Sequence, residues 1–158
     1  MVNLVKGSAA PDFTLPADSG QSFTLSAQRG QPVVLFFYPE DDTPSCTNEN
    51  LEFSALADAF AAAGVTLVGI SPDPVKAHAA FRAKFGLNHL LLSDPDRQVI
   101  EAYGLWQEKS MYGRTYMGLV RTSVLIDAKG DVAEVWKVTR VKGHAQKVLE
   151  AAQALTRH

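Results

Sequence analysis

The sequence predicts an α/β fold in which the parallel half of a sheet is followed by an antiparallel half. Two largely apolar runs of strand length, 33–38 and 65–70, are typical of strands that are buried on both faces. Each run is followed by a segment in which apolar residues recur every three or four positions, which indicates a crossover helix. A later pair of strand-like runs is separated by a three-residue turn and predicts a hairpin.

The elements follow one another in a definite order. The first thirty residues alternate short strand-like pieces with turns, which predicts a hairpin that opens the fold. The first buried strand stops at Pro39, and Thr43 and Pro44 suit the N-cap and first position of a helix that runs to Gly64. The remaining elements are a helix near 77–85 that ends at Gly86, a short strand at 90–92, a short helix at 99–103, a hairpin of 123–127 and 132–136, and a closing helix over 145–155.

This order is the thioredoxin-like arrangement: a central mixed sheet flanked by helices, with right-handed crossovers and an N-terminal β-hairpin. A chain of 158 residues without repeats or linkers suits one domain over 1–158. One apolar-rich stretch shows no regular pattern, and we expect it to form a loop over the functional site, more for packing than for substrate contact. Its large side chains are Trp106, Met111, Tyr112, Tyr116 and Met117.

Composition excludes several classes of function. Fifteen basic against seventeen acidic residues argue against a nucleic-acid-coating protein or a polybasic membrane binder. No apolar run has membrane length, and the first residues lack a signal-peptide pattern, so we expect a cytoplasmic protein that binds neither nucleic acid nor membranes. The four histidines are scattered without metal-ligand spacing, so we expect no catalytic histidine, no metal and no cofactor; they are His78, His89, His144 and His158.

The single cysteine, Cys46, is the strongest candidate for chemistry. It excludes an intrachain disulfide, a four-cysteine zinc site and a C-x-x-C pair. A lone cysteine is more often an inert core residue. However, Cys46 is expected in the first turn of a helix at the carboxyl end of a central strand, where α/β folds place ligands. Helix N-termini favour a thiolate, and the neighbouring residues are small or polar. The position therefore favours a reactive thiol.

The residues around Cys46 resemble a known family. The spacing Pro39-x-x-x-Thr43-x-x-Cys46 resembles the active-site signature of peroxiredoxins, and YPEDDTPSCTNE resembles their Q-type subgroup, also called the bacterioferritin comigratory protein type. The resemblance extends over almost the whole chain through the motifs APDFTL, SPDPVKAHAAF, LLSD, AYGLW and RTSVLID. It implies a thiol-dependent peroxidase for antioxidant defence, which reduces hydrogen peroxide and organic hydroperoxides through a Cys46 sulfenic acid.

The resemblance also implies roles for four other residues. Thr43 and Arg121 complete the site, Pro39 shields the sulfur and fixes the turn, and Glu49 orients the arginine. Without the resemblance, Arg121 reads as a surface arginine at a strand start, and Glu49 as a solvated helix residue. A thiolate alone is a poor peroxidase, because nucleophilicity falls as the thiolate becomes less basic. Arg121, the Thr43 hydroxyl and backbone N–H groups are therefore expected to stabilise the charge that moves to the departing oxygen.

One departure from the family bears on the mechanism. Many Q-type members carry a resolving cysteine five positions after the first, where this chain has Leu51. The sequence therefore resembles a one-cysteine version, recycled by an external thiol such as thioredoxin, glutaredoxin or glutathione, and we expect a monomer or a weak homodimer.

Other functions remain possible at this point. A tyrosine phosphatase would need arginine where Glu52 stands, and a thioredoxin-type reductase would need cysteine in place of Thr43. The alternative is a non-enzymatic redox sensor or a chaperone-like binding module on the same fold, which an assay of peroxide reduction distinguishes from the enzyme.

Overall fold

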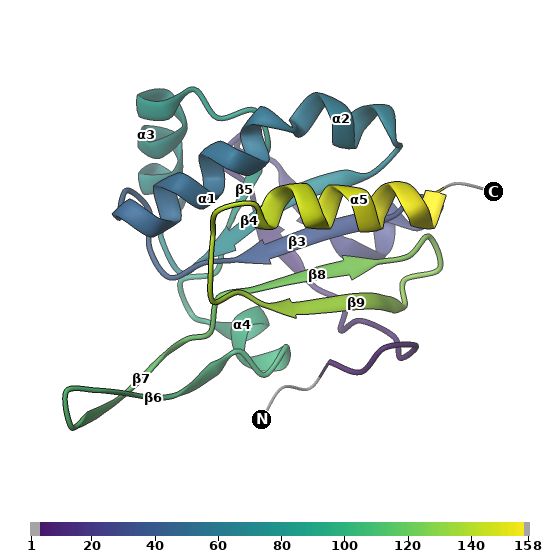
Figure 1. The fold of residues 1–158 in the computed structure, drawn as a ribbon. Helices are drawn as coiled ribbons and strands as arrows, with labels where there is room; N and C mark the ends of the chain where they lie inside the picture. Colours follow the sequence, from purple (N-terminus) through teal and green to yellow (C-terminus); the bar gives the residue numbers. More distant parts are fainter. Residues whose placement is uncertain (1–3, 157–158) are drawn as a thin grey trace.

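The computed structural model describes residues 4–156, and a five-stranded mixed sheet lies at its centre (Figure 1). The strands lie in the order β5-β4-β3-β8-β9. Their bounds are β3 Val33–Phe37, β4 Thr66–Ser71, β5 Leu90–Ser93, β8 Thr122–Ile126 and β9 Val132–Lys137. β3, β4 and β5 are parallel, whereas β8 is antiparallel to both β3 and β9. The predicted parallel half and antiparallel half are thus confirmed.

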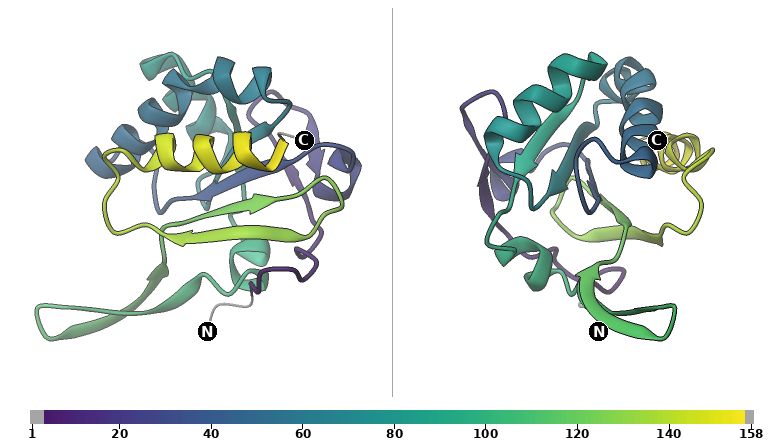
Figure 2. Two further views of the ribbon diagram at one scale, coloured as in Figure 1. Left: turned by 45° about the vertical axis from the view of Figure 1, so that its right-hand side comes forward. Right: turned by 90° about the vertical axis from the view of Figure 1, so that its left-hand side faces the viewer.

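Helices cover both faces of this sheet (Figure 2). Four of them share one core with the sheet: α1 (Pro44–Ala55), α2 (Ala57–Ala62), α3 (Val75–Phe85) and α5 (His144–Thr156). The opposite core is closed by α4 (Gln98–Ala102) and by the N-terminal segment. That segment contains the predicted hairpin, β1 (Thr14–Pro16) with β2 (Ser22–Thr24), and the short 3-10 helix η1 (Leu25–Gln28). No helix among residues 4–156 is long and apolar enough to cross a membrane.

The central strand β3 serves both cores. Alternate side chains of β3 and of Tyr38, which follows it, divide between the two faces: Val33, Leu35 and Phe37 enter one core, and Val34, Phe36 and Tyr38 enter the other. All six are at most 1% exposed, as expected for a central strand. Burying each large side chain contributes about 1.5–3 kcal/mol to folding. A side chain at Gly69 on β4 would meet the Phe36 ring, since a Cβ there would lie 2.8 Å from it. This packing fixes the strand whose end leads into the loop before Cys46.

The helix expected over 44–63 is interrupted in the structure. α1 ends at Ala55, and α2 begins at Ala57 after Leu56 leaves helical geometry at φ −102°, ψ 6°. The apolar periodicity continues across the break, so the pattern of apolar residues does not indicate it. Phe53 and Phe60 still enter the same core, with ring centroids 6.1 Å apart. The expectation of one helix was therefore wrong, although its buried residues were identified.

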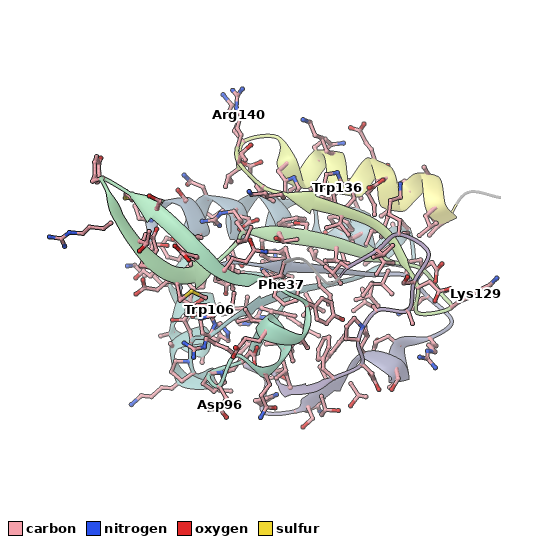
Figure 3. The ribbon with its side chains drawn as sticks, turned by 90° about the horizontal axis from the view of Figure 1, so that it is seen from below. Phe37, Asp96, Trp106, Lys129, Trp136 and Arg140 are labelled. Carbon is pink, nitrogen blue, oxygen red and sulfur yellow. The ribbon has the colours of Figure 1, made fainter. Side chains whose placement is uncertain are left out.

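The stretch expected to be a loop over the site is instead a hairpin. β6 (Trp106–Met111) and β7 (Arg114–Leu119) pair antiparallel and project from the body of the molecule (Figures 1 and 2). Its turn places Tyr112 and Gly113 at positive φ, which suits a two-residue hairpin turn. Four large side chains of the stretch are exposed rather than packed: Met111, Tyr112, Tyr116 and Met117. Only Trp106, at the base, packs against the core that contains Phe37 (Figure 3).

Candidate active site

Cys46 lies where the central strand gives way to a helix. β3 ends at Phe37, a loop follows, and α1 begins at Pro44, so Cys46 is the third residue of the helix. Its side chain is a free thiol and only 1% exposed. Pro44 has no N–H, and the N–H of Thr47 makes the first bond, 2.8 Å long, to the carbonyl of Thr43. The N–H groups of Ser45 and Cys46 precede that bond and are donors available at the helix start.

Arg121 reaches the sulfur from the neighbouring strand. It directly precedes β8, whose first residue, Thr122, pairs with the last residue of β3, Phe37. This antiparallel register places Arg121 at the edge where β3 ends. One guanidinium nitrogen, Nη2, donates to Cys46 Sγ at 3.4 Å, and the other, Nη1, donates to Glu49 Oε1 at 2.5 Å. Arg121 therefore contacts both Cys46 and Glu49, which lie one turn apart on α1.

The Glu49–Arg121 pair is almost dry. The side chains are 1% and 15% exposed, and the second carboxyl oxygen of Glu49, Oε2, is buried without a hydrogen-bond partner. Burial raises the pKa of Glu49 to about 7, although the charge and hydrogen bonds of Arg121 act in the opposite direction. Burial lowers the pKa of Arg121, but the negative charges of Glu49 and Cys46 outweigh it and raise that pKa. Arg121 remains a cation, while Glu49 titrates near neutrality.

Thr43 and Pro39 flank the helix start without bonding to the sulfur. Thr43 occupies the predicted N-cap position with extended backbone, but its side chain makes no capping bond. Its hydroxyl donates instead to the Glu40 carbonyl at 2.9 Å. With its proton engaged, the hydroxyl oxygen offers lone pairs, so it is an acceptor toward the site and not the donor expected from the sequence. Pro39 is partly buried in the loop between β3 and α1.

A buried ion pair holds the same loop. Asp41 Oδ2 lies 2.7 Å from His78 Nδ1, and Asp41 Oδ1 accepts a 2.7 Å bond from the Tyr38 hydroxyl. His78 Nε2 faces the Leu92 carbonyl, which can only accept, so both ring nitrogens carry protons. Burial lowers the pKa of His78, but Asp41 outweighs that effect and raises it. Asp73 completes a cluster with metal-like spacing, yet its atoms bond Asp41 and Ser71, so this donor set fits an ion pair.

Two other histidines have structural partners. His89 Nε2 lies 2.8 Å from Asn50 Oδ1, and His144 Nε2 lies 2.8 Å from the hydroxyl of Ser123. Burial lowers the pKa of His89 to about 3 and that of His144 to about 4, so both rings are neutral near pH 7. His158 lies outside the described residues. Sequence reasoning missed Asn50, although a polar residue one turn after Cys46 on a helix was a signal to test.

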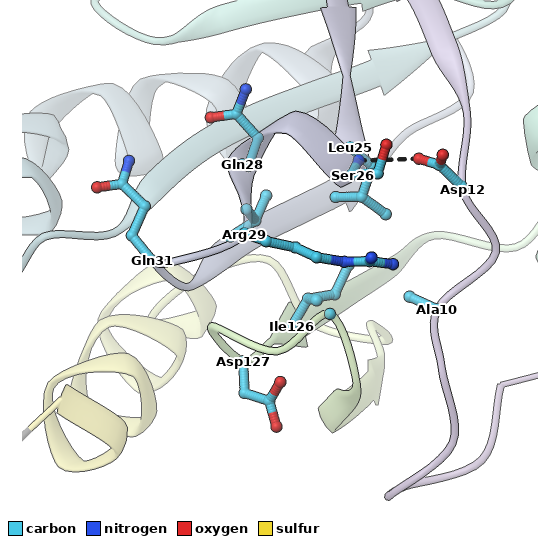
Figure 4. A pocket seen from close by; sticks show the side chains of 11 residues that line it. Ala10, Asp12, Leu25, Ser26, Gln28, Arg29, Gln31, Ile126 and Asp127 are labelled. Atoms are coloured by element: carbon cyan, nitrogen blue, oxygen red, sulfur yellow. Dashed lines mark hydrogen bonds between the residues drawn. The ribbon is translucent and has the colours of Figure 1, made fainter.

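A pocket at the far end of the sheet is separate from this site. Val33, at the start of β3, and Ile126, at the end of β8, line it, whereas Cys46 follows the other end of β3. Figure 4 shows the side chain of Arg29 extending across this pocket, close to Ser26 and Asp12. The cavity itself has a volume of only about 10 Å³, about the size of one water molecule.

Comparison with known proteins gives consistent matches. Residues 6–135 match the model of the AhpC/TSA family. Peroxiredoxin Bcp of Xanthomonas campestris is 41% identical over 143 residues, covering 90% of this chain and 89% of that protein. Peroxiredoxin Bcp of Bacillus subtilis is 36% identical over 150 residues, covering 95% and 96%.

Solved structures show the same likeness. Peroxiredoxin Q of Xanthomonas campestris superposes with a TM-score of 0.90 at 38% identity, covering 99% of each chain. A second structure, with a TM-score of 0.89, 38% identity and coverage of 99% of this chain and 100% of that chain, comes from work on alkyl peroxide reduction by the Xanthomonas campestris bacterioferritin comigratory protein. The thioredoxin-fold architecture is thereby confirmed.

Proposed function

Because the chain belongs to the AhpC/TSA family and is a thiol-dependent peroxidase of the peroxiredoxin Bcp (Q) type, we propose that Cys46 is the residue that attacks the hydroperoxide. The observation that carries this proposal is the 3.4 Å contact between Arg121 Nη2 and the Sγ of a cysteine buried at a helix start. A non-enzymatic role on the same fold is not favoured, since the relatives include a protein studied for alkyl peroxide reduction.

In the proposed oxidation, the Cys46 thiolate attacks the terminal oxygen of the hydroperoxide. A sulfur–oxygen bond forms, the O–O bond breaks, and the departing oxygen takes a proton and leaves as water or an alcohol. Negative charge thus moves from sulfur to the departing oxygen. Arg121 and the N–H groups of Ser45 and Cys46 are fixed donors around this path, so they stabilise the transition state more than the ground state.

Thr43 and Glu49 assist in different ways. The Thr43 hydroxyl donates to the Glu40 carbonyl, so its oxygen can accept a hydrogen bond from the O–H of the hydroperoxide and orient the terminal oxygen toward the sulfur. Glu49 holds one edge of the guanidinium through Nη1, which leaves Nη2 aimed at the sulfur. Pro39, in the loop between β3 and α1, limits the access of water to the sulfur at the helix start.

Recycling requires a thiol from outside the chain. Cys46 is the single cysteine of the sequence, so its sulfenic acid has no partner thiol of its own. We propose that one external thiol displaces water to form a mixed disulfide, and a second releases the Cys46 thiol with formation of the external disulfide. Thioredoxin, glutaredoxin and glutathione all supply such thiols in the reducing cytoplasm, where we place the protein as a monomer or weak homodimer.

The proposal is tested by peroxide consumption in the presence of excess thiol. Cys46→Ser is nearly isosteric and is expected to abolish turnover with an unchanged circular dichroism spectrum. Asn48→Ala, an exposed position two residues further along α1, is the matched control and is expected to turn over normally. Undiminished peroxide consumption by Cys46→Ser would exclude Cys46 as the attacking residue.

A further inference from the structure

A buried pair of polar side chains lies directly behind the reactive turn. Asn50, one helical turn after Cys46, donates from Nδ2 to the Cys46 carbonyl at 2.9 Å. On its other side, Asn50 Oδ1 lies 2.8 Å from His89 Nε2. The two residues are 0% and 4% exposed, so water does not compete for these bonds. Neither residue contacts the sulfur, and the catalysis described above uses neither of them.

The direction of these hydrogen bonds is fixed. The Cys46 carbonyl can only accept, so the amide nitrogen of Asn50 faces it and the amide oxygen faces His89. His89 is neutral and therefore carries one N–H, which must be on Nε2 to serve that oxygen. Its Nδ1 is left bare and buried without a partner. The fold thus tolerates an unpaired acceptor on His89, while its Nε2 donates to Asn50, which in turn donates to the Cys46 carbonyl.

The pair links the reactive turn to the rigid sheet. His89 immediately precedes β5, which pairs with β4 in the central sheet. A second bond joins the same segments one turn further along, since Ser54 Oγ accepts from the N–H of Asn88 at 2.8 Å. Residues 46, 50 and 54 follow one another at helical spacing and share one face of α1. Only the Asn50–His89 link acts on the turn that contains Cys46.

This link opposes the movement that an external thiol requires. Cys46 is 1% exposed and Arg121 lies against its sulfur, so a protein or peptide thiol cannot reach the sulfenic acid unless the first turn of α1 moves. We propose that Asn50 and His89 form a latch that keeps this turn wound, favours oxidation and delays reduction by external thiols. The proposal rests on the proposed function, in which the thiol comes from outside. Asn50 and His89 are positioning residues within it.

The rate at which Cys46 is alkylated in the reduced protein tests the latch without any turnover of peroxide. In Asn50→Ala both bonds are lost while helix propensity is kept or improved, and alkylation of Cys46 by iodoacetamide is expected to accelerate about 3- to 10-fold, as for the loss of one net hydrogen bond. Ser54→Ala is the matched control, because it removes the neighbouring link but not the latch, and its alkylation rate is expected to match wild type. His89→Phe keeps an aromatic ring against Phe36 and is expected to give a smaller acceleration.

Kinetics separate a latch from a merely structural contact. In Asn50→Ala, the rate constant for reduction of the sulfenic acid by glutathione is expected to rise and that for oxidation by hydrogen peroxide to fall, whereas a general loss of stability would not move them in opposite directions. Equal alkylation rates in wild type, Asn50→Ala and His89→Phe would overturn the latch. Absence of peroxide turnover in wild type would overturn the proposed function instead, and the alkylation result would still stand on its own.

Discussion

Removing the guanidinium of Arg121 is expected to slow oxidation of Cys46 about 10²- to 10³-fold, the usual loss for one fixed donor to a developing oxyanion. Nη2 lies 3.4 Å from Sγ. At that separation, with an effective dielectric constant of about 20, the attraction between the guanidinium and a thiolate is about 5 kcal/mol. Much of it stabilises the thiolate before reaction, so only the part that grows in the transition state, about 2.7–4 kcal/mol, accelerates the chemical step.

The assay must therefore separate thiolate formation from reaction. Single-turnover oxidation by hydrogen peroxide is measured for wild type and Arg121→Ala over a range of pH, and ultraviolet absorbance of the thiolate gives the ionised fraction at each pH. Arg121→Lys is the informative partner variant, because an ammonium group keeps the charge but cannot bridge Glu49 and the sulfur as the planar guanidinium does. We expect Arg121→Lys to recover only part of the rate.

Stability is the necessary control, since Arg121→Ala leaves Glu49 buried without its partner. Glu49 already has a pKa of about 7, so in the variant it is expected to take up a proton rather than unfold the protein. The double variant Arg121→Ala with Glu49→Gln has no carboxyl group at this position, so it also removes the proton uptake by Glu49. If Arg121→Ala, corrected for thiolate fraction, oxidises within a few-fold of the wild-type rate, the assignment of Arg121 to transition-state stabilisation is wrong.

Four further predictions concern protons and the fate of the oxidised sulfur. The folded pKa of Glu49 exceeds its ordinary 4.5, so the free energy of unfolding should fall by up to about 3 kcal/mol as pH rises from 4.5 to about 7, and denaturant titrations should show this fall reduced in Glu49→Gln. His78 has a raised pKa, so its contribution to stability is present below pH 6.5 and lost as pH rises through the folded value. In Asp41→Asn, NMR titration should show the pKa of His78 lowered below its ordinary value. An unchanged pKa of His78 in that variant would contradict the ion pair. Without reductant, the wild type should remain monomeric on non-reducing gels and gain mass in oxygen steps, whereas quantitative dimerisation through Cys46 would contradict the external-thiol mechanism. Leu51→Cys should form an internal disulfide only by unwinding α1, since positions five apart on a helix have Cα atoms about 8.6 Å apart, beyond the reach of about 7 Å for a disulfide.

The position of Cys46 could be predicted from the sequence because its causes are local. An apolar run that stops at Pro39, followed by Thr43 and Pro44, defines a strand end and a helix start within a few residues. The roles of Arg121 and Glu49, in contrast, came from the family resemblance, since their residue types alone read as surface positions. The register of β3 with β8 brings Arg121 to the sulfur across 75 residues of sequence.

The predictions for two elements were wrong for the same physical reason: neither element leaves a mark in the pattern of apolar residues. The β6–β7 hairpin has largely exposed or half-exposed side chains on both faces, so no alternation of apolar residues marks its strands. The break at Leu56 lies within an unbroken apolar period, and Phe53 and Phe60 enter one core on either side of it. Periodicity reports which residues are buried but not where the backbone bends to bury them.

The sequence by itself determined the fold class, the mixed sheet and a single thiol at a helix start, because patterning, turn residues and composition act over short distances along the chain. Only the tertiary structure decided what surrounds that thiol. The hydrogen bond of Asn50 to His89 joins residues 39 positions apart, and the link of Asp41 to His78 spans 37. Such partners are chosen by strand order and helix packing, which place side chains from distant segments in one buried environment where each polar group must be satisfied.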